Sequence, residues 1–296
     1  LQGATLNLER AFTNFFRKKA SFPKFKTKKH PRQSFQIPQH YKVDWENNKV
    51  FLPKIGWVKA KLHRKFEGEM RTVTISKTPT GKYFISIIVE DGKPIPNKQP
   101  FDEKTTIGID LGITHFCILS NGEKIDNPKH LKKSLQRLKV LQKRLSRKQK
   151  GSKNREKARL KLAKLHEKIT NQRNDFQHKL SFKLIGENQA IALEDLNVKG
   201  MVKNHNLAQS ILDVAWSSFV SKLMYKAEKF GKTIIKIGRF EPSSKICSVC
   251  GYYNGNLDLK NRVWKCPVCN TEHDRDVNAA VNIKKFALDR QNLIGL

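Results

Sequence analysis

Three carboxylates stand at the edges of short apolar runs, and two paired-cysteine motifs lie between the second and the third. Asp110 follows the apolar residues IGI, Glu194 ends the run IALE, and Asp276 precedes the segment VNAAVNI. The motifs CSVC (247–250) and CPVC (266–269) separate Glu194 from Asp276. Apolar runs of about four to eight residues are typical of buried strands. The order therefore predicts an α/β core whose strands end in acids, interrupted by a small cysteine-rich module.

Positive charge dominates the composition. The chain of 296 residues has 59 Lys and Arg against 26 Asp and Glu, a formal net charge of +33. Such a surface gains affinity for phosphates by releasing condensed counterions, so we expect a nucleic acid as the partner. An anionic membrane is the competing polyanion, but no apolar stretch approaches about 20 residues and no signal peptide is evident. We therefore expect no membrane partner and a cytoplasmic location.

Four of the five cysteines form the two CxxC pairs, which are separated by fifteen residues. In a small secreted domain such pairs would be disulfides, whereas in a large basic chain without a secretion signal they are typical of zinc ligands. A site with four thiolates has no open position for a substrate, so we expect a structural zinc ion. His273 is an alternative to one cysteine, and Cys117 is expected to be a buried structural thiol. The expected ligands are Cys247, Cys250, Cys266 and Cys269.

The first part of the chain divides into a basic beginning and a series of short β-type runs. Residues 6–16 have the apolar spacing of a helix, and the stretch 17–33 alternates Phe with Lys and Pro. That stretch suits either a base-stacking surface or a solvated linker. From 34 to 90, β-type runs recur between turn residues. They predict a small antiparallel barrel or sandwich that ends at the linker KPIPNK (93–98).

The second part predicts a sheet with the acids at one edge. Parallel pairing of two central strands would place Asp110 beside Glu194. A helix over 206–231 follows, and a final helix over 273–290 would bring Asp276 to the same edge. The expected strands are TTIGIDLG (105–112), which opens a β-meander, QAIALEDL (189–196) and KTIIKIG (232–238).

Residues 129–185 are helical in pattern and strongly basic. Between Lys129 and Lys168 there are seventeen Lys or Arg and two Glu, with a turn at 150–154. Apolar residues keep only a narrow stripe, so we expect two antiparallel helices that expose most of their surface. A solvated face normally mixes both signs of charge, so this excess favours nucleic-acid contact. The candidate contact residues, including one at the final helix, are Lys132, Lys133, Arg137, Arg144, Arg147, Arg155 and Arg275.

Carboxylates at strand ends suit magnesium or manganese, which prefer hard oxygen ligands and keep part of their water shell. Phosphodiester cleavage can use two such ions about 3.5–4 Å apart. Each acid also has an ordinary explanation. Asp110 could cap a turn, Glu194 or Asp195 could lie at a solvated strand end, and a helix N-terminus could use Asp274 or Asp276. A partly buried Asp110 beside IGI is better explained by the charge of an ion, so the residues indicate a metal-dependent nuclease.

Together these motifs resemble the TnpB (OrfB) family of insertion-sequence RNA-guided nucleases, relatives of the type V CRISPR effectors. GIDLG (108–112) and IALEDL (191–196) look like the first and second RuvC motifs of that family. PSSKICSVCG (242–251) with WKCPVC (264–269) is similar to its C-terminal zinc finger, and HDRDVNAAVNI (273–283) is similar to its third motif. The resemblance covers almost the whole chain.

The resemblance implies an RNase H-like (RuvC) nuclease fold of the α/β class with an inserted zinc ribbon, preceded by a small antiparallel β-barrel (wedge-like) domain. It implies that Asp110, Glu194 and Asp276 are catalytic and hold two Mg (or Mn) ions, because the family's acid matches the second Asp of HDRD. One structural Zn ion completes the cofactors. The implied protein is a prokaryotic, nucleoid-associated DNA endonuclease whose partners are a guide RNA from the element's end and target DNA.

Two alternatives to a guided endonuclease stay open, a nuclease-inactive guided DNA-binding regulator and a transposase acting directly in DNA strand transfer. Family members carry further residues in front, so we expect recognition of a target-adjacent motif to be affected here. The expected domains are 1–33, a basic helical remnant and linker; 34–98, the wedge-like barrel; 99–240, the first part of the RuvC-like domain with a basic helical insertion at 129–185; 241–272, the zinc ribbon; and 273–296, the C-terminal helix.

Overall fold

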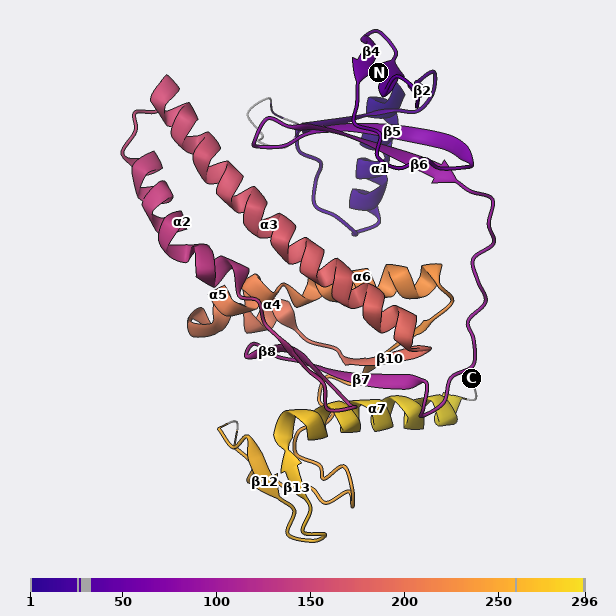
Figure 1. The fold of residues 1–296 in the computed structure, drawn as a ribbon, viewed down its shortest axis with the longest axis vertical. Helices are drawn as coiled ribbons and strands as arrows, with labels where there is room; N and C mark the ends of the chain where they lie inside the picture. The colour runs from indigo at the N-terminus through magenta and orange to yellow at the C-terminus, as the bar shows by residue number, and fades with distance from the viewer. Residues whose placement is uncertain (1, 26, 28–32, 259, 295–296) are drawn as a thin grey trace. The chain divides into compact units, whose positions relative to one another are not determined.

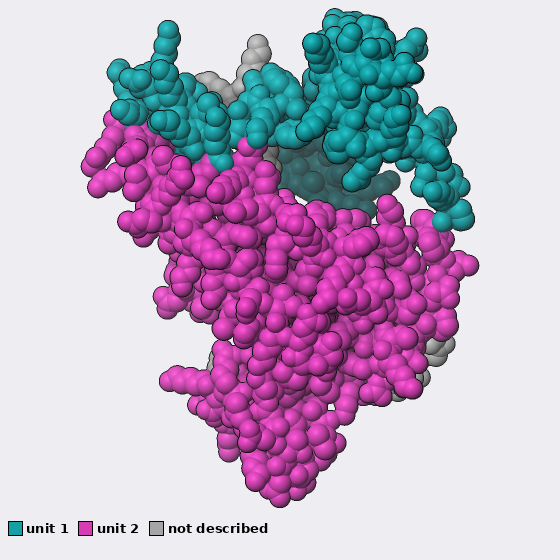
Figure 2. Space-filling view, in the orientation of Figure 1, with its two compact units in different colours: residues 1–94, 148–164 teal, residues 95–147, 165–296 magenta. Residues whose placement is uncertain are grey.

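The computed structural model (Figure 1) describes residues 2–25, 27, 33–258 and 260–294. Side chains are described for those of these residues that lie between 3 and 290. It divides into two units, residues 1–94 with 148–164 and residues 95–147 with 165–296 (Figure 2). Each unit has its own sheets. Part of the basic stretch predicted at 17–33 falls outside the described residues.

The larger unit is built on a mixed five-stranded sheet with the order β11-β10-β7-β8-β9 (Figure 1). β7 (Thr106–Leu111), β8 (His115–Leu119) and β9 (Lys124–Asp126) form an antiparallel meander, as predicted. β10 (Ala190–Glu194) pairs parallel to β7, and β11 (Thr233–Ile237) pairs parallel to β10. The carboxyl ends of β7, β10 and β11 therefore meet at one edge of the sheet.

The long helices follow the predicted segments with one exception, and a short helix at 198–201 was not predicted. The helix expected over 206–231 is broken at Ala215, whose φ of 55° is left-handed. Gln177 Nε2 donates to the carbonyls of Val214 and Ala215 at 2.9 and 3.2 Å, so a distant side chain supports the break. Among the described residues, no helix is both long and apolar enough to cross a bilayer. The helices are α1 (Gln2–Phe16), α2 (His130–Ser146), α3 (Lys153–Glu187), α4 (Val198–Met201), α5 (His205–Val214), α6 (Trp216–Lys229) and α7 (Arg275–Ile294).

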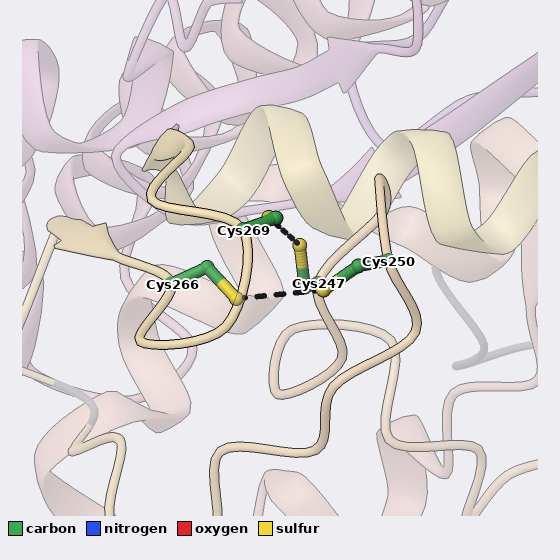
Figure 3. A group of neighbouring side chains, drawn as sticks. All are labelled: Cys247, Cys250, Cys266 and Cys269. Atoms are coloured by element: carbon green, nitrogen blue, oxygen red, sulfur yellow. Dashed lines mark hydrogen bonds between the residues drawn. The ribbon is translucent and has the colours of Figure 1, made fainter.

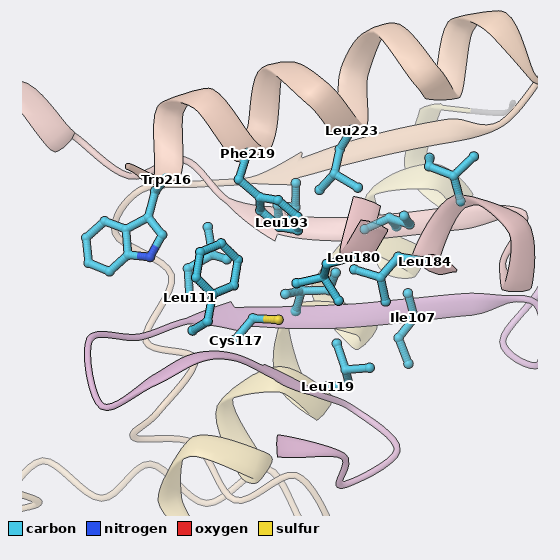
Figure 4. Close-up of a cluster of buried hydrophobic side chains, with 14 of the residues drawn as sticks. Ile107, Leu111, Cys117, Leu119, Leu180, Leu184, Leu193, Trp216, Phe219 and Leu223 are labelled. Carbon is cyan, nitrogen blue, oxygen red and sulfur yellow. The ribbon is translucent and has the colours of Figure 1, made fainter. Parts of the chain in front are cut away.

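Helices cover both faces of the five-stranded sheet, which explains why its strands are apolar without alternation. On one face Ile107 of β7 packs in a cluster with Leu184 of α3 and Phe219 of α6 (Figure 4). On the other face Ile283 of α7 packs with Ala192 of β10. Cys117 lies in the first cluster, and its burial raises the pKa of its thiol, as expected of a structural cysteine.

The smaller unit holds two open sheets, so the closed barrel predicted from the sequence was wrong. β1 (Gln33–Ile37), β5 (Glu69–Lys77) and β6 (Tyr83–Glu90) form one antiparallel sheet, and β2 (Lys42–Asp44), β3 (Lys49–Leu52) and β4 (Gly56–Lys59) form the other. Short turns join β2, β3 and β4, so each pairs with its chain neighbour. Residues 60–68 form no strand and separate this meander from β5. The spacing of β-type runs indicated strands but not which edges would pair.

The cysteine-rich module precedes α7. β12 (Val263–Lys265) and β13 (Glu272–Asp274) form a two-stranded antiparallel sheet. A small cluster of Cys247, Leu257, Trp264 and Cys266 is buried beside it. A core this small favours stabilisation by a bound metal.

Candidate active site

Asp110 and Glu194 lie on neighbouring parallel strands at the same edge of the sheet. Ile109 of β7 pairs with Leu193 of β10, so the residues that follow them come side by side where the strands end. Both acidic residues are partly buried. Because helices cover both faces of the sheet, the strand ends are where polar side chains can be accommodated. The adjacency predicted from the sequence is present in the fold.

Asp276 approaches this region from α7, and a glycine in β7 allows the approach. A Cβ on Gly108 would lie 2.1 Å from the carbonyl oxygen of Ala280 and 2.8 Å from the backbone nitrogen of Lys284. Only glycine lets the backbones of β7 and α7 come so close. Asp276 occupies the first turn of α7, so this close packing sets its position relative to Asp110.

The three carboxylates influence one another electrostatically. The pKa of Asp110 is raised to about 7, mainly because burial disfavours its charged form and further because the charges of Glu194 and Asp276 repel it. Arg275 and Arg262 partly oppose this increase. A carboxyl group whose pKa is raised by burial and by like charges is typical of a functional centre. A cation at this edge would relieve the penalty on its ionised form.

Glu194 and Asp276 each have a hydrogen-bond donor of their own. The Ser243 hydroxyl donates to Glu194 Oε1 at 2.6 Å, and Arg262 Nη1 donates to Asp276 Oδ2 at 2.9 Å. In the part of the chain that the structure describes, these acids do not form a group whose ligand atoms all lie within 4.8 Å of one another. The fold thus brings the three acids into one electrostatic neighbourhood, while Ser243 and Arg262 orient two of them.

The neighbouring acids have structural partners. Asp274 Oδ1 accepts hydrogen bonds from the backbone nitrogens of Asp276 and Val277, both at 3.1 Å, so it caps α7. Its other oxygen pairs with Lys124 at 2.5 Å. Asp195 pairs with Arg239 at 2.8 Å. The charge of Asp276 acts on Asp110, whereas Asp274 serves as a helix cap, so Asp276 is the better candidate for the third acid of the site.

Two buried asparagines of α7 were missed in the sequence. Asn278 and Asn282 are each 2% exposed, and their amide groups donate to the carbonyl of Ile246 at 2.7 and 2.6 Å. Asn282 also donates to the carbonyl of Ser243 at 2.7 Å. They tie the segment before the first cysteine pair to α7 and so position the hydroxyl that holds Glu194. Their spacing of four residues in NAAVN was the available signal.

The four predicted zinc ligands converge (Figure 3). All four sulfur atoms lie within 4.8 Å of one another, with 3.6 Å between Cys247 and Cys269 and 3.5 Å between Cys250 and Cys266. Zinc–sulfur bonds of about 2.3 Å in a tetrahedron separate sulfurs by about 3.8 Å, so the arrangement fits zinc. The turns that follow the two pairs are alike, because Gly251 and Asn270 both have left-handed φ angles, 78° and 56°.

His273 lies beside this cluster without belonging to it. Its Nε2 is 3.0 Å from the sulfur of Cys247, and its ring lies against Trp264 with 4.8 Å between centroids. Hydrogen bonds from Thr271 lower the pKa of the Cys269 thiol to about 6, which favours the thiolate that zinc binds. The four cysteines, and not the alternative with His273, make up the compact group.

The residues predicted to contact nucleic acid differ in their exposure to solvent. Lys132, Lys133, Arg137 and Arg144 of α2 are exposed, as is Arg147 at its C-terminus, whereas Arg155 and Arg275 are partly buried. Arg155 Nη1 donates to the carbonyl of Lys148 at 2.8 Å. Arg275 is close enough to lower the pKa of Asp110.

An unpredicted buried acid fixes the start of α2. Asp213 of α5 is 8% exposed and accepts hydrogen bonds from the backbone nitrogen of Leu131 at 3.0 and 3.2 Å. It also pairs with Arg173 of α3 at 3.3 Å. No local sequence signal predicts this role, because the partners lie at least forty residues away along the chain.

The sequence is similar to two families and to named relatives. Residues 86–205 match the OrfB_IS605 family, "Probable transposase", and residues 216–283 match the "Cas12f1-like, TNB domain" family. The chain is 43% identical to a "Putative RNA-guided DNA endonuclease" of Streptomyces pristinaespiralis, over 96% of this chain and 70% of the relative. It is 34% identical to "Putative RNA-guided DNA endonuclease InsQ" of Escherichia coli strain K12, over 96% of this chain and 73% of the relative.

The fold is similar to a solved structure of the same kind. The cryo-EM structure of the Cas12f1-sgRNA-target DNA complex aligns with a TM-score of 0.58 and 17% identity, covering 96% of this chain and 70% of that one. The overall fold of this chain is thus shared with that Cas12f1 structure. The chain is a member of the TnpB-like (OrfB) family to which the named relatives belong, which confirms the resemblance seen in the sequence.

Proposed function

We propose that this protein is an insertion-sequence-associated, RNA-guided DNA endonuclease that depends on magnesium or manganese. The observation that carries the proposal is the pairing of β7 with β10, which sets Asp110 beside Glu194. The charge of Asp276 acts on the same carboxyl group. Membership of the TnpB-like family supports the reaction, and the basic composition supports RNA and DNA as partners. These partners imply a location at the nucleoid of a prokaryotic cell.

Asp110, Glu194 and Asp276 are the proposed catalytic residues and metal ligands of an RNase H-like (RuvC) domain. Their oxygens are the hard donors that magnesium prefers, and the raised pKa of Asp110 is the electrostatic penalty that a cation would offset. Two divalent ions, when bound, supply an activated water and charge stabilisation at the leaving oxygen. Ser243 and Arg262 orient Glu194 and Asp276.

The remaining parts have supporting roles in this proposal. The four cysteines hold one structural zinc ion, because a closed set of thiolates leaves no position for substrate. Exposed lysines and arginines of α2 contact the phosphates of the RNA–DNA duplex, and Arg275 contacts the phosphate that is cut. The antiparallel sheets of residues 33–90 act as a wedge-like domain that holds guide RNA.

Cleavage of target DNA tests the proposal. The protein is purified with its copurifying RNA, that RNA is sequenced, and matched DNA is incubated with magnesium. We expect Asp110→Asn and Glu194→Gln to bind the target and to lose cleavage, while Asp274→Asn, which changes a helix cap, keeps measurable cleavage. Normal cutting by Asp110→Asn or Glu194→Gln would refute the assignment.

Two alternatives are less well supported. A nuclease-inactive regulator would bind matched DNA without product under either metal, but this chain retains all three acids. A transposase acting directly would give strand-transfer products in an excision assay. The regulator alternative does not explain why the fold brings three acids into one electrostatic neighbourhood, and the relatives named as endonucleases favour hydrolysis over strand transfer.

A further inference from the structure

A cavity adjoins the candidate active site within the larger unit. It has a volume of about 230 Å³ and is bounded by Glu194 at the end of β10, by the segment after that strand and by one face of α6. Its polar side consists of the exposed residues Ser217, Ser221 and Lys236 and of Asp195, whose charge is paired with Arg239. Its apolar wall consists of Leu111, Leu196, Val198, Trp216, Val220 and Met224.

Trp216 in this wall has a donor without an acceptor. The residue is 2% exposed, and its indole Nε1 is buried with no hydrogen-bond partner. Because that nitrogen is buried, Trp216 contributes an apolar surface to the cavity wall. Trp216 lies at one edge of the buried cluster, next to Leu111 at the end of β7 (Figure 4). Its position follows from the left-handed Ala215, which starts α6 at that point.

The cavity combines features that suit a heterocyclic base. Apolar walls provide a surface for the flat ring, because base stacking depends on the π-face and tolerates any sequence. Lys236 on β11 supplies a positive charge for the adjoining phosphate. Glu194 lies at the boundary between this cavity and the acidic edge, so a strand whose phosphate reaches the acids has its next base at the cavity.

We propose that this cavity receives one unstacked base of the DNA strand that is cut, next to the scissile phosphate. The subsite rests on the proposed nuclease function and extends it. Holding a flanking base fixes the register of the phosphate against Asp110 and Glu194, which is how positioning accelerates such a reaction. The expected contribution of a stacked base is roughly 5- to 100-fold in rate or affinity.

Filling the cavity tests the subsite. Ser221→Phe and Ser217→Phe place a ring on the exposed cavity side of α6, where folding should be preserved. Glu228→Phe adds the same ring at an exposed position of α6 that does not line the cavity. Each protein is bound to single-stranded DNA that carries one 5-iododeoxyuridine, irradiated, and digested to locate the crosslink. In the wild type and in Glu228→Phe we expect crosslinks to Trp216 or Met224.

The two filling variants should lose this crosslink by at least about fivefold and should cut matched DNA more slowly by roughly 5- to 100-fold. Wild-type yields in both filling variants, or no crosslink between residues 216 and 224 in the wild type, would overturn the subsite. Cleavage is scored in separate samples. A crosslink without any cleavage refutes the nuclease and leaves the cavity only as a base-binding site, whereas cleavage that is indifferent to both fillings refutes the subsite alone.

Discussion

The raised pKa of Asp110 predicts an unusual dependence of stability on pH in the absence of magnesium. The pKa rises from 3.8 to about 7, a difference of roughly three units. Between these values the folded chain binds a proton that the unfolded chain has released, so stability falls as pH rises, by about 1.4 kcal/mol per unit. This loss of stability is complete above the pKa of Asp110 in the folded state and is at most about 4 kcal/mol.

Asp110→Asn removes this penalty, because asparagine stays neutral. We expect the free energy of unfolding of the variant to exceed that of the wild type by an amount that grows from about pH 4 to about pH 8, approaching 4 kcal/mol. Urea unfolding in magnesium-free buffer with zinc retained, followed by tryptophan fluorescence, measures the difference. Adding magnesium at the higher pH should stabilise the wild type and leave the variant unchanged.

Asp274→Asn is the matched control with the opposite sign. Burial tends to raise the pKa of Asp274, but Lys124 and the backbone of Val277 hold that pKa below its usual value. Its ionised form therefore stabilises the fold above the unfolded pKa, and the asparagine variant should be less stable than the wild type near neutral pH. A difference between Asp110→Asn and the wild type that stays constant across the pH range would refute the raised pKa and the shared field of the acids.

Three further predictions concern packing, zinc and charge. Gly108→Ala should lower the free energy of unfolding by about 1–3 kcal/mol and reduce cleavage, because the added Cβ meets the backbone of α7. The control Gly186→Ala has open space around its Cβ and should be neutral or stabilising by about 1 kcal/mol. Thermal unfolding measures both. Chelation of zinc should unfold the module around the four cysteines, seen as loss of amide protection there, and equal protection with and without zinc would contradict a structural site. DNA affinity should fall by about 10³–10⁵ between 50 and 200 mM salt for 6–10 phosphate contacts. Alanine at Lys132, Lys133 and Arg137 should reduce the slope of log affinity against log salt concentration by about 3. An unchanged slope would exclude α2 from the interface.

Several features followed from local sequence. The apolar runs predicted the strands of the larger sheet, and the two CxxC pairs identified a cysteine group that the fold brings within 4.8 Å. The end of the helix predicted over 206–231 is also close to that observed, because α6 ends at Lys229 and Gly231 has a left-handed φ of 63°. These signals depend on residues close together in the chain or on chemistry that few side chains share.

Pairing and partners were decided at longer range. The β-type runs before residue 90 form two sheets and not one barrel, since edge pairing depends on the connections between strands. The helix break at Ala215 is supported by a hydrogen bond from the side chain of Gln177, 38 residues away in the chain. The hydrogen bond from Ser243 to Glu194 joins residues 49 positions apart, and the one from Arg262 to Asp276 joins residues 14 apart. Local sequence patterns therefore predict neither contact.

The sequence by itself determined the charge, the acids, the cysteines and the segments that become strands and helices, because each of these is a property of residue type or of short-range spacing. Only the tertiary structure decided which aspartate of HDRD acts electrostatically on Asp110, which donors hold the other acids, and that a cavity adjoins Glu194. Those outcomes depend on how closely α6 and α7 pack against the sheet, which is set by contacts between residues far apart in the chain.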